Sequence, residues 1–252
     1  MAGSKSDIAV VVVQGCFQKP LVYEQLSGSI RKHGYQTFQP ELPTCTEIES
    51  PGFAKKDLND DTKVVRDVIE DLVEQKGRKV IVVMHSYGGL VGSNAVLEKW
   101  DLDKRQSLGL AGGVAHLFYF SAFIMGKGQS VLGTYGESPN NEEKDGKLYF
   151  KNGAKLLYND LPEEEAALWA SRMVPQSYAV QTTTITNAAY EFVPSTYVIC
   201  DNDKAVPPQV QEIFSRAAGS HVERIDSGHS PMLSRKDKLV DIIVSVIEKS
   251  TS

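Results

Sequence analysis

The 252-residue sequence has few cysteines, and their spacing matches no common disulfide or metal-binding motif. The three cysteines, Cys16, Cys45 and Cys200, lie far apart and form no C-x-x-C motif and no cluster with histidine. An odd, scattered set of this kind indicates neither a disulfide framework nor a zinc site. We therefore expect no metal, and a reducing compartment with the cytoplasm as the default.

Long apolar runs and basic clusters are also missing. The apolar run at 8–13 is too short for a signal peptide or a membrane span, and no other stretch reaches 18 apolar residues. With 27 Lys and Arg against 32 Asp and Glu, the net charge of −5 disfavours binding to nucleic acid or to an anionic membrane. A small molecule is the expected partner, and the sequence does not decide between a monomer and a homodimer.

Patterns of buried strands alternate with patterns of amphipathic helices along most of the chain. Strands are predicted at 8–13, 37–39, 79–84, 114–121, 195–200 and 222–225, and helices at 21–32, 61–75, 90–99, 207–216 and 238–248. This order is typical of an α/β protein whose mostly parallel sheet carries helices on both faces. At this length and with 41% hydrophobic residues, we expect a single domain spanning 1–252.

Residues 124–193 depart from this alternation. The stretch 126–136 is glycine-rich, 137–147 is polar, and acidic residues at 163–165 open a helix. We interpret 124–193 as a helical lid inserted into the domain and call it the inserted segment. It is expected to form no sheet.

Ser86 lies between the strand at 79–84 and the helix at 90–99, and it is followed by Gly88 and Gly89. A serine on a sharp turn from strand to helix is typical of a nucleophile elbow. The backbone N–H of Tyr87 would then point at the negative charge that develops during attack. The short motif is not specific, because a serine that caps a helix gives the same pattern.

A base and an acid follow in the chain order Ser, Asp, His that hydrolases with such an elbow use. Asp203 follows the strand at 195–200, and His229 follows the strand at 222–225. Ligands of open parallel sheets bind at the carboxyl ends of the strands, where all three residues would lie. Asp201 is in the same turn as Asp203 and competes for the role of the acid, although bonding to the local backbone is favoured for it.

Four motifs make the sequence resemble the α/β-hydrolase superfamily, and within it the compact esterases that include plant methylesterases and hydroxynitrile lyases. They are Val-Val-Gln-Gly-Cys at 12–16, Val-Val-Met-His-Ser-Tyr-Gly-Gly at 82–89, Cys-Asp-Asn-Asp-Lys-Ala-Val-Pro at 200–207 and Asp-Ser-Gly-His-Ser-Pro at 226–231. The resemblance covers nearly the whole chain. It implies an α/β-hydrolase fold with about six strands and no cofactor.

The resemblance also implies the roles of the site residues. It makes Ser86 the nucleophile, His229 the base and Asp203 the acid that orients the base. It places the oxyanion hole at the backbone N–H groups of Cys16 and Tyr87. Four further residues are expected at the substrate: Gly15, which lets the backbone approach closely, and the aromatic Phe17, Phe123 and Trp169.

The sequence departs from the family pattern at three positions. Met84 stands where glycine is usual, Gln14 where histidine is common, and Ser230 where the cyanohydrin-cleaving members have lysine. Without that lysine a lyase acting on cyanohydrins is disfavoured. We therefore expect a serine hydrolase that cleaves a small carboxylic ester through an acyl-enzyme. A lactonase, a lyase or cyclase of secondary metabolism with the same triad, and a ligand receptor on the same fold are the alternatives.

Overall fold

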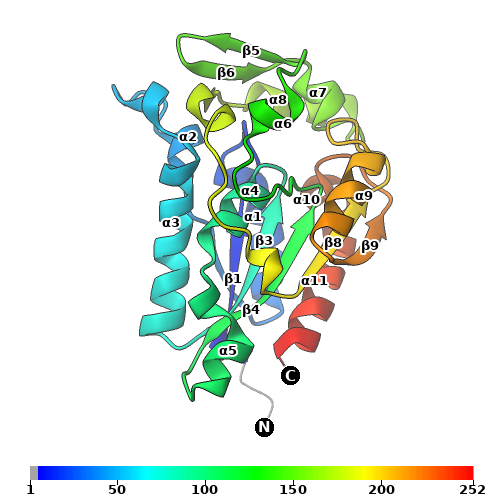
Figure 1. The fold of residues 1–252 in the computed structure, drawn as a ribbon. Coiled ribbons are helices and arrows are strands. Elements are labelled where there is room, and N and C mark those ends of the chain that lie inside the picture. The colour runs from blue at the N-terminus through cyan, green and yellow to red at the C-terminus, as the bar shows by residue number, and fades with distance from the viewer. Residues whose placement is uncertain (1–4, 252) are drawn as a thin grey trace.

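A six-stranded parallel sheet runs through the centre of the computed structural model, which describes residues 5–251 (Figure 1). In spatial order its strands are β2 (Gln36–Phe38), β1 (Ile8–Val13), β3 (Lys79–His85), β4 (Gly113–Phe120), β8 (Ser195–Cys200) and β9 (His221–Ile225). Every neighbouring pair is parallel. The predicted sheet is therefore confirmed in its direction and in its number of strands.

Both faces of the sheet are buried, which explains why its inner strands read as unbroken apolar runs. In β1, alternate residues from Ala9 to Val13 pack toward α3 (Leu58–Glu70) and α4 (Gly88–Ala95). The residues between them pack toward α1 (Glu24–Lys32) and α11 (Lys236–Thr251). The strand's period of two thus divides its side chains between two cores.

Further helices lie around these layers. They are α2 (Pro43–Thr46), a π-helical turn (Asp71–Gln75), α5 (Leu102–Ser107), α9 (Pro208–Ala217) and α10 (Pro231–Ser234). The helix predicted at 90–99 ends early, because the backbone turns extended at Val96. Within residues 5–251, no helix is both long enough and apolar enough to cross a bilayer.

Most of the inserted segment covers the carboxyl ends of the strands at the top of Figure 1, and its last part, with the short helix Ala189–Glu191, runs down beside the sheet. It holds α6 (Val131–Tyr135), α7 (Gly153–Leu156) and α8 (Glu163–Ser171), and an antiparallel sheet of β5 (Asn141–Lys144), β6 (Lys147–Phe150) and β7 (Gln176–Ser177). The prediction that this segment forms no sheet is wrong. Asp145 and Gly146, with φ of 53° and 73°, make the two-residue turn between β5 and β6, and Asp-Gly is a strong hairpin signal.

Candidate active site

Ser86 lies on a strained turn directly after β3. Its φ of 52° is in the left-handed region, which is costly for a residue with a side chain. Its carbonyl oxygen accepts hydrogen bonds from the N–H groups of Gly89 and Phe123, both at 3.0 Å. A Cβ on Gly88 would collide with the carbonyl oxygen of Val13, so glycine is required there. Packing and hydrogen bonds thus hold the turn that presents Ser86.

His229 and Asp203 come from the loops that follow β9 and β8, and both are buried. His229 Nδ1 lies 2.9 Å from Asp203 Oδ2. Asp203 Oδ1 accepts the N–H groups of Ala205 at 2.8 Å and Val206 at 2.9 Å, and Oδ2 accepts Nε2 of Gln211 at 3.0 Å. These donors fix the buried carboxylate and compensate its charge. The Asp203 carboxylate is therefore held in a fixed position against the His229 ring.

The competing carboxylate, Asp201, is on the surface. Its Oδ1 lies 2.8 Å from Nε of Arg224, and the same guanidinium also contacts Glu212. The turn after β8 thus sends one carboxylate outward to an arginine and the other inward to His229.

Ser121 is a site residue that the sequence did not reveal. It follows β4 directly, has a φ of 49° and is fully buried. Its hydroxyl donates to Asp203 Oδ2 and lies 3.0 Å from His229 Nδ1. The signal available was its position alone, because the carboxyl end of a central strand is where site residues gather.

The two expected oxyanion donors lie on either side of Ser86. Neither the Cys16 N–H nor the Tyr87 N–H donates to a backbone carbonyl within residues 5–251, and both residues line the cavity. A Cβ on Gly15 would be 3.0 Å from the Ser86 Cβ, so Gly15 lies against the turn that carries Ser86. Burial raises the pKa of the Cys16 thiol to about 12, which keeps it neutral and unreactive.

His85 connects the turn at Gly15 to the loop of His229. Its Nε2 lies 2.8 Å from the His229 carbonyl oxygen, which can only accept, so Nε2 carries the proton. Its Nδ1 lies 2.6 Å from the Tyr23 hydroxyl, which accepts the Gly15 N–H at 2.8 Å. Burial lowers the pKa of His85 well below 6.5, and the nearby His229 adds to this shift. A neutral His85 is therefore a structural bridge.

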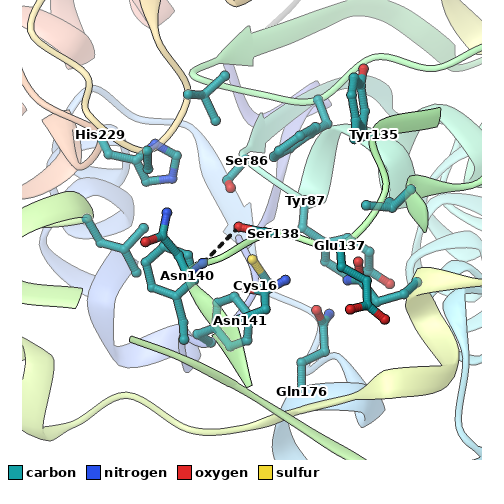
Figure 2. A pocket seen from close by; sticks show the side chains of 18 of the residues that line it. Cys16, Ser86, Tyr87, Tyr135, Glu137, Ser138, Asn140, Asn141, Gln176 and His229 are labelled. Carbon is teal, nitrogen blue, oxygen red and sulfur yellow. Dashed lines mark hydrogen bonds between the residues drawn. The ribbon is translucent and has the colours of Figure 1, made fainter. Parts of the chain in front are cut away.

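Ser86, His229, Cys16 and Tyr87 line one cavity of about 360 Å³, beneath the inserted segment (Figure 2). Within the described chain no hydrogen bond joins Ser86 to His229. Such contacts often tighten only when substrate is bound. The cavity has apolar walls made by Phe17, Leu90, Phe123, Val131, Phe150 and Val206, and a polar wall made by Glu137, Ser138, Asn140, Asn141, Gln176 and Gln181.

The four residues expected at the substrate do not all reach this cavity. Phe17 and Phe123 line it, and the Phe17 ring stacks on Phe150 with 5.2 Å between centroids. Gly15 and Trp169 are not among the described residues that line the cavity. The Trp169 ring packs instead in the core beneath the inserted segment, with Nε1 3.4 Å from Glu165 Oε1.

Similarity to known proteins extends along nearly the whole chain. It is 29% identical over 247 residues to the alpha/beta hydrolase nvfD of Aspergillus novofumigatus, covering 93% of this chain and 94% of that protein. It is 23% identical over 223 residues to methylesterase 1 of Arabidopsis thaliana, covering 83% and 79%. The crystal structure of the methylesterase MES16 from Arabidopsis has the same fold, with a TM-score of 0.73, 18% identity and coverage of 95% and 98%. Because the model of the alpha/beta hydrolase family matches residues 10–242, the chain belongs to that family and is a hydrolase enzyme.

Proposed function

We propose that this enzyme is a serine hydrolase that cleaves a small carboxylic ester, with Ser86 as nucleophile, His229 as base and Asp203 as orienting acid. One observation carries the proposal. The Ser86 hydroxyl, on a turn with a φ of 52°, faces the same cavity as His229, and the other side of that imidazole is held by Asp203 at 2.9 Å. This is the arrangement by which a serine is activated in acyl transfer.

The reaction follows from the hydrogen-bond directions. Neutral His229 donates its Nδ1 proton to Asp203, so Nε2 is free to accept the Ser86 proton as Oγ attacks the ester carbonyl carbon. The N–H groups of Cys16 and Tyr87 stabilise the oxyanion, each by about 3 kcal/mol. Collapse of the tetrahedral intermediate expels the alcohol, which takes the proton back from His229. Water activated by the same imidazole then releases the acid from Ser86.

The shape and lining of the cavity support a small substrate with one apolar and one polar end. Its volume of about 360 Å³ is at the lower end of the range for ligand pockets. Aromatic and aliphatic walls suit an acyl or aryl group, while the amides of Asn140, Asn141 and Gln176 suit hydroxyl or carbonyl groups at the opposite end. A relative named methylesterase supports an ester as the class, and a lactone fits the same chemistry. The enzyme is expected to act in the cytoplasm, which its free thiols support.

The test is Ser86→Ala measured on short aryl and methyl esters. We expect kcat to fall by about 10³-fold or more, with an unchanged circular dichroism spectrum, because the nucleophile is lost while the turn remains. Ser107→Ala, an exposed serine on α5, is the matched control and keeps full activity. A phosphonate ester should label Ser86 in the unmodified enzyme, and product masses should show the addition of one water. An unchanged rate with Ser86→Ala would rule the mechanism out.

A further inference from the structure

We propose that Asp61, on α3, is a positioning residue that holds the oxyanion donor Tyr87 in place, an inference that rests on the proposed function. The Tyr87 hydroxyl donates to Asp61 Oδ2 at 2.8 Å. Tyr87 directly follows the nucleophile, and Asp61 is 26 residues away in the chain. The contact therefore ties the nucleophile turn to a helix outside it.

The Asp61 carboxylate is fully buried. Oδ1 accepts the N–H of Thr44 at 3.0 Å, and Oδ2 accepts the Thr44 hydroxyl at 2.6 Å as well as Tyr87. Within residues 5–251, Asp61 forms no ion pair. A buried carboxylate without a cation is costly even when it is hydrogen-bonded, and packing alone would be served by an apolar residue. Such a group at a catalytic turn points to a role in geometry.

Tyr87 needs an anchor of this kind. Oxyanion stabilisation requires N–H donors that are already held about 2.7–3.1 Å from the position of the oxyanion, without reorganisation during the reaction. The N–H of Tyr87 lies just before α4, and the Tyr87 carbonyl oxygen accepts the N–H of Leu90 at 2.9 Å. Tyr87 is only 4% exposed, so its hydroxyl would be an unsatisfied buried group without Asp61. The carboxylate thus fixes the ring, and the ring fixes the turn.

The same network reaches the wall of the cavity. Gln176 lines the cavity from β7, and its Nε2 donates to Thr44 Oγ1 at 3.3 Å. The Gln176 amide donates to Thr44, Thr44 donates to Asp61, and Tyr87 donates to Asp61 from the other side. Every hydrogen bond in this chain is directed toward the carboxylate, so the ionised form of Asp61 fits it. Protonation would place an O–H among groups that already donate.

Protonation of Asp61 should therefore loosen Tyr87. Burial raises the pKa of Asp61 to about 7, although the hydrogen bonds from Thr44 and Tyr87 oppose the shift. The titratable groups around it include Asp60, whose charge raises this pKa further, and Lys56, whose own pKa Asp61 helps to raise. The Cys45 thiol and the Tyr87 phenol stay neutral because burial raises the pKa of each. As the pH falls through about 7, protonation of Asp61 should therefore lower kcat, in addition to any decrease caused by other groups.

The experiment compares Tyr87→Phe with Tyr119→Phe. Tyr119 is a buried tyrosine whose hydroxyl lies 2.7 Å from Ser93 Oγ, so its hydroxyl contacts a neutral group instead of a carboxylate. We expect Tyr87→Phe to lower kcat about tenfold with KM within twofold, because a hydrogen bond to a charged group is lost. Tyr119→Phe should keep the kcat of the unmodified enzyme. On the acid side of the pH profile, the slope of log kcat against pH should decrease by one in Tyr87→Phe, because the Asp61 proton no longer affects activity. It should stay unchanged in Tyr119→Phe.

Equal kcat values for the two tyrosine variants would overturn the positioning role. Ser86→Ala is measured alongside: if it stays active, the proposed function fails, whereas an inactive Ser86→Ala with a fully active Tyr87→Phe contradicts the role of Asp61 alone. A second measurement needs no variant. The amide resonance of Tyr87 in the unmodified enzyme should shift between pH 6 and 8 with a midpoint near that of Asp61, and a constant resonance would overturn the predicted pH dependence.

Discussion

The side chain of Met84 occupies the space left by Gly92, and its sulfur would collide with a Cβ on residue 92. Met84 is the last residue but one of β3, and Gly92 is in α4, on the far side of the nucleophile turn. Where related hydrolases usually have a glycine two residues before the nucleophile, this chain has a long side chain. The space for it is supplied by the helix.

This fit predicts a strong coupling between the two positions. Gly92→Ala should lower the free energy of unfolding by about 1–3 kcal/mol through overpacking. Met84→Ala should lower it by about 2–4 kcal/mol through the cavity it leaves. The double variant should lose about 1 kcal/mol less free energy of unfolding than the sum of the two single losses, because each change relieves the other. Unfolding in urea measures all three values.

Gly28→Ala is the control for this cycle. It adds a methyl group to α1, where the nearest atom would be the Arg31 guanidinium at 3.7 Å. Helix propensity should then raise stability by about 0.5–1 kcal/mol. Additive effects of Gly92→Ala and Met84→Ala would contradict the predicted fit.

Ser121→Gly should lower kcat about tenfold and leave KM nearly unchanged. The variant removes a donor from the buried Asp203 carboxylate, and hydrogen bonds to charged groups contribute about 1.5–3 kcal/mol. Glycine accepts the φ of 49° at this position, so the backbone has no reason to move. Asn152→Gly, at another residue of positive φ outside the cavity, is the control for the backbone effect. Steady-state kinetics with equal kcat for both variants would refute the contribution of Ser121.

His85 should make stability depend on pH. Its folded pKa is lowered by burial, so below about 6.5 the unfolded chain binds a proton that the folded chain does not. The free energy of unfolding should therefore fall as the pH drops, by up to about 1.4 kcal/mol per pH unit. His85→Gln lacks this contribution, so the stability advantage of the unmodified enzyme should shrink from pH 7 to pH 5 in urea titrations.

His116, whose pKa burial lowers to about 4, is present in both proteins, so its effect cancels from the comparison. His33→Gln, at an exposed site after α1, should leave the slope unchanged. A difference between His85→Gln and the unmodified enzyme that stays constant with pH would disprove the assignment.

Asp160 should support catalysis through the loop of the base. Its Oδ2 accepts the N–H of Gly228 at 2.6 Å, one residue before His229. Asp160→Ala removes this acceptor and should lower kcat about tenfold, since small displacements of a catalytic group are costly. Asp160→Asn keeps an acceptor oxygen and should stay within twofold of the unmodified enzyme. If the two variants behave alike in kcat, the hydrogen bond to Gly228 is not what matters.

The sequence predicted the features that depend on strong local patterns. Runs of β-branched residues such as 8–13 are buried on both faces, and they marked the central strands. Ser86, Asp203 and His229 were found because each follows a strand of the sheet. The structure brings His229 and Asp203 into contact as that order predicts.

Features that depend on packing between distant segments were missed. β5 is an exposed strand of polar residues, so it lacks the alternation of a half-buried strand. Ser121 and Asp61 owe their importance to partners 82 and 26 residues away, which no local pattern encodes. Trp169 packs in the core and does not line the cavity. The sequence alone does not show which of these two places an aromatic residue of the inserted segment will take.

The loop before α8 connects the inserted segment, which covers the cavity, to the loop that carries His229. Asn159 donates to the Asn202 carbonyl oxygen at 3.0 Å, and a Cβ on Gly228 would collide with the side chains of Asn159 and Asp160. Chimeras that exchange 124–193 between relatives would therefore disturb the histidine along with the specificity. In such recombinants 158–160 and 226–231 must be inherited together from the same parent.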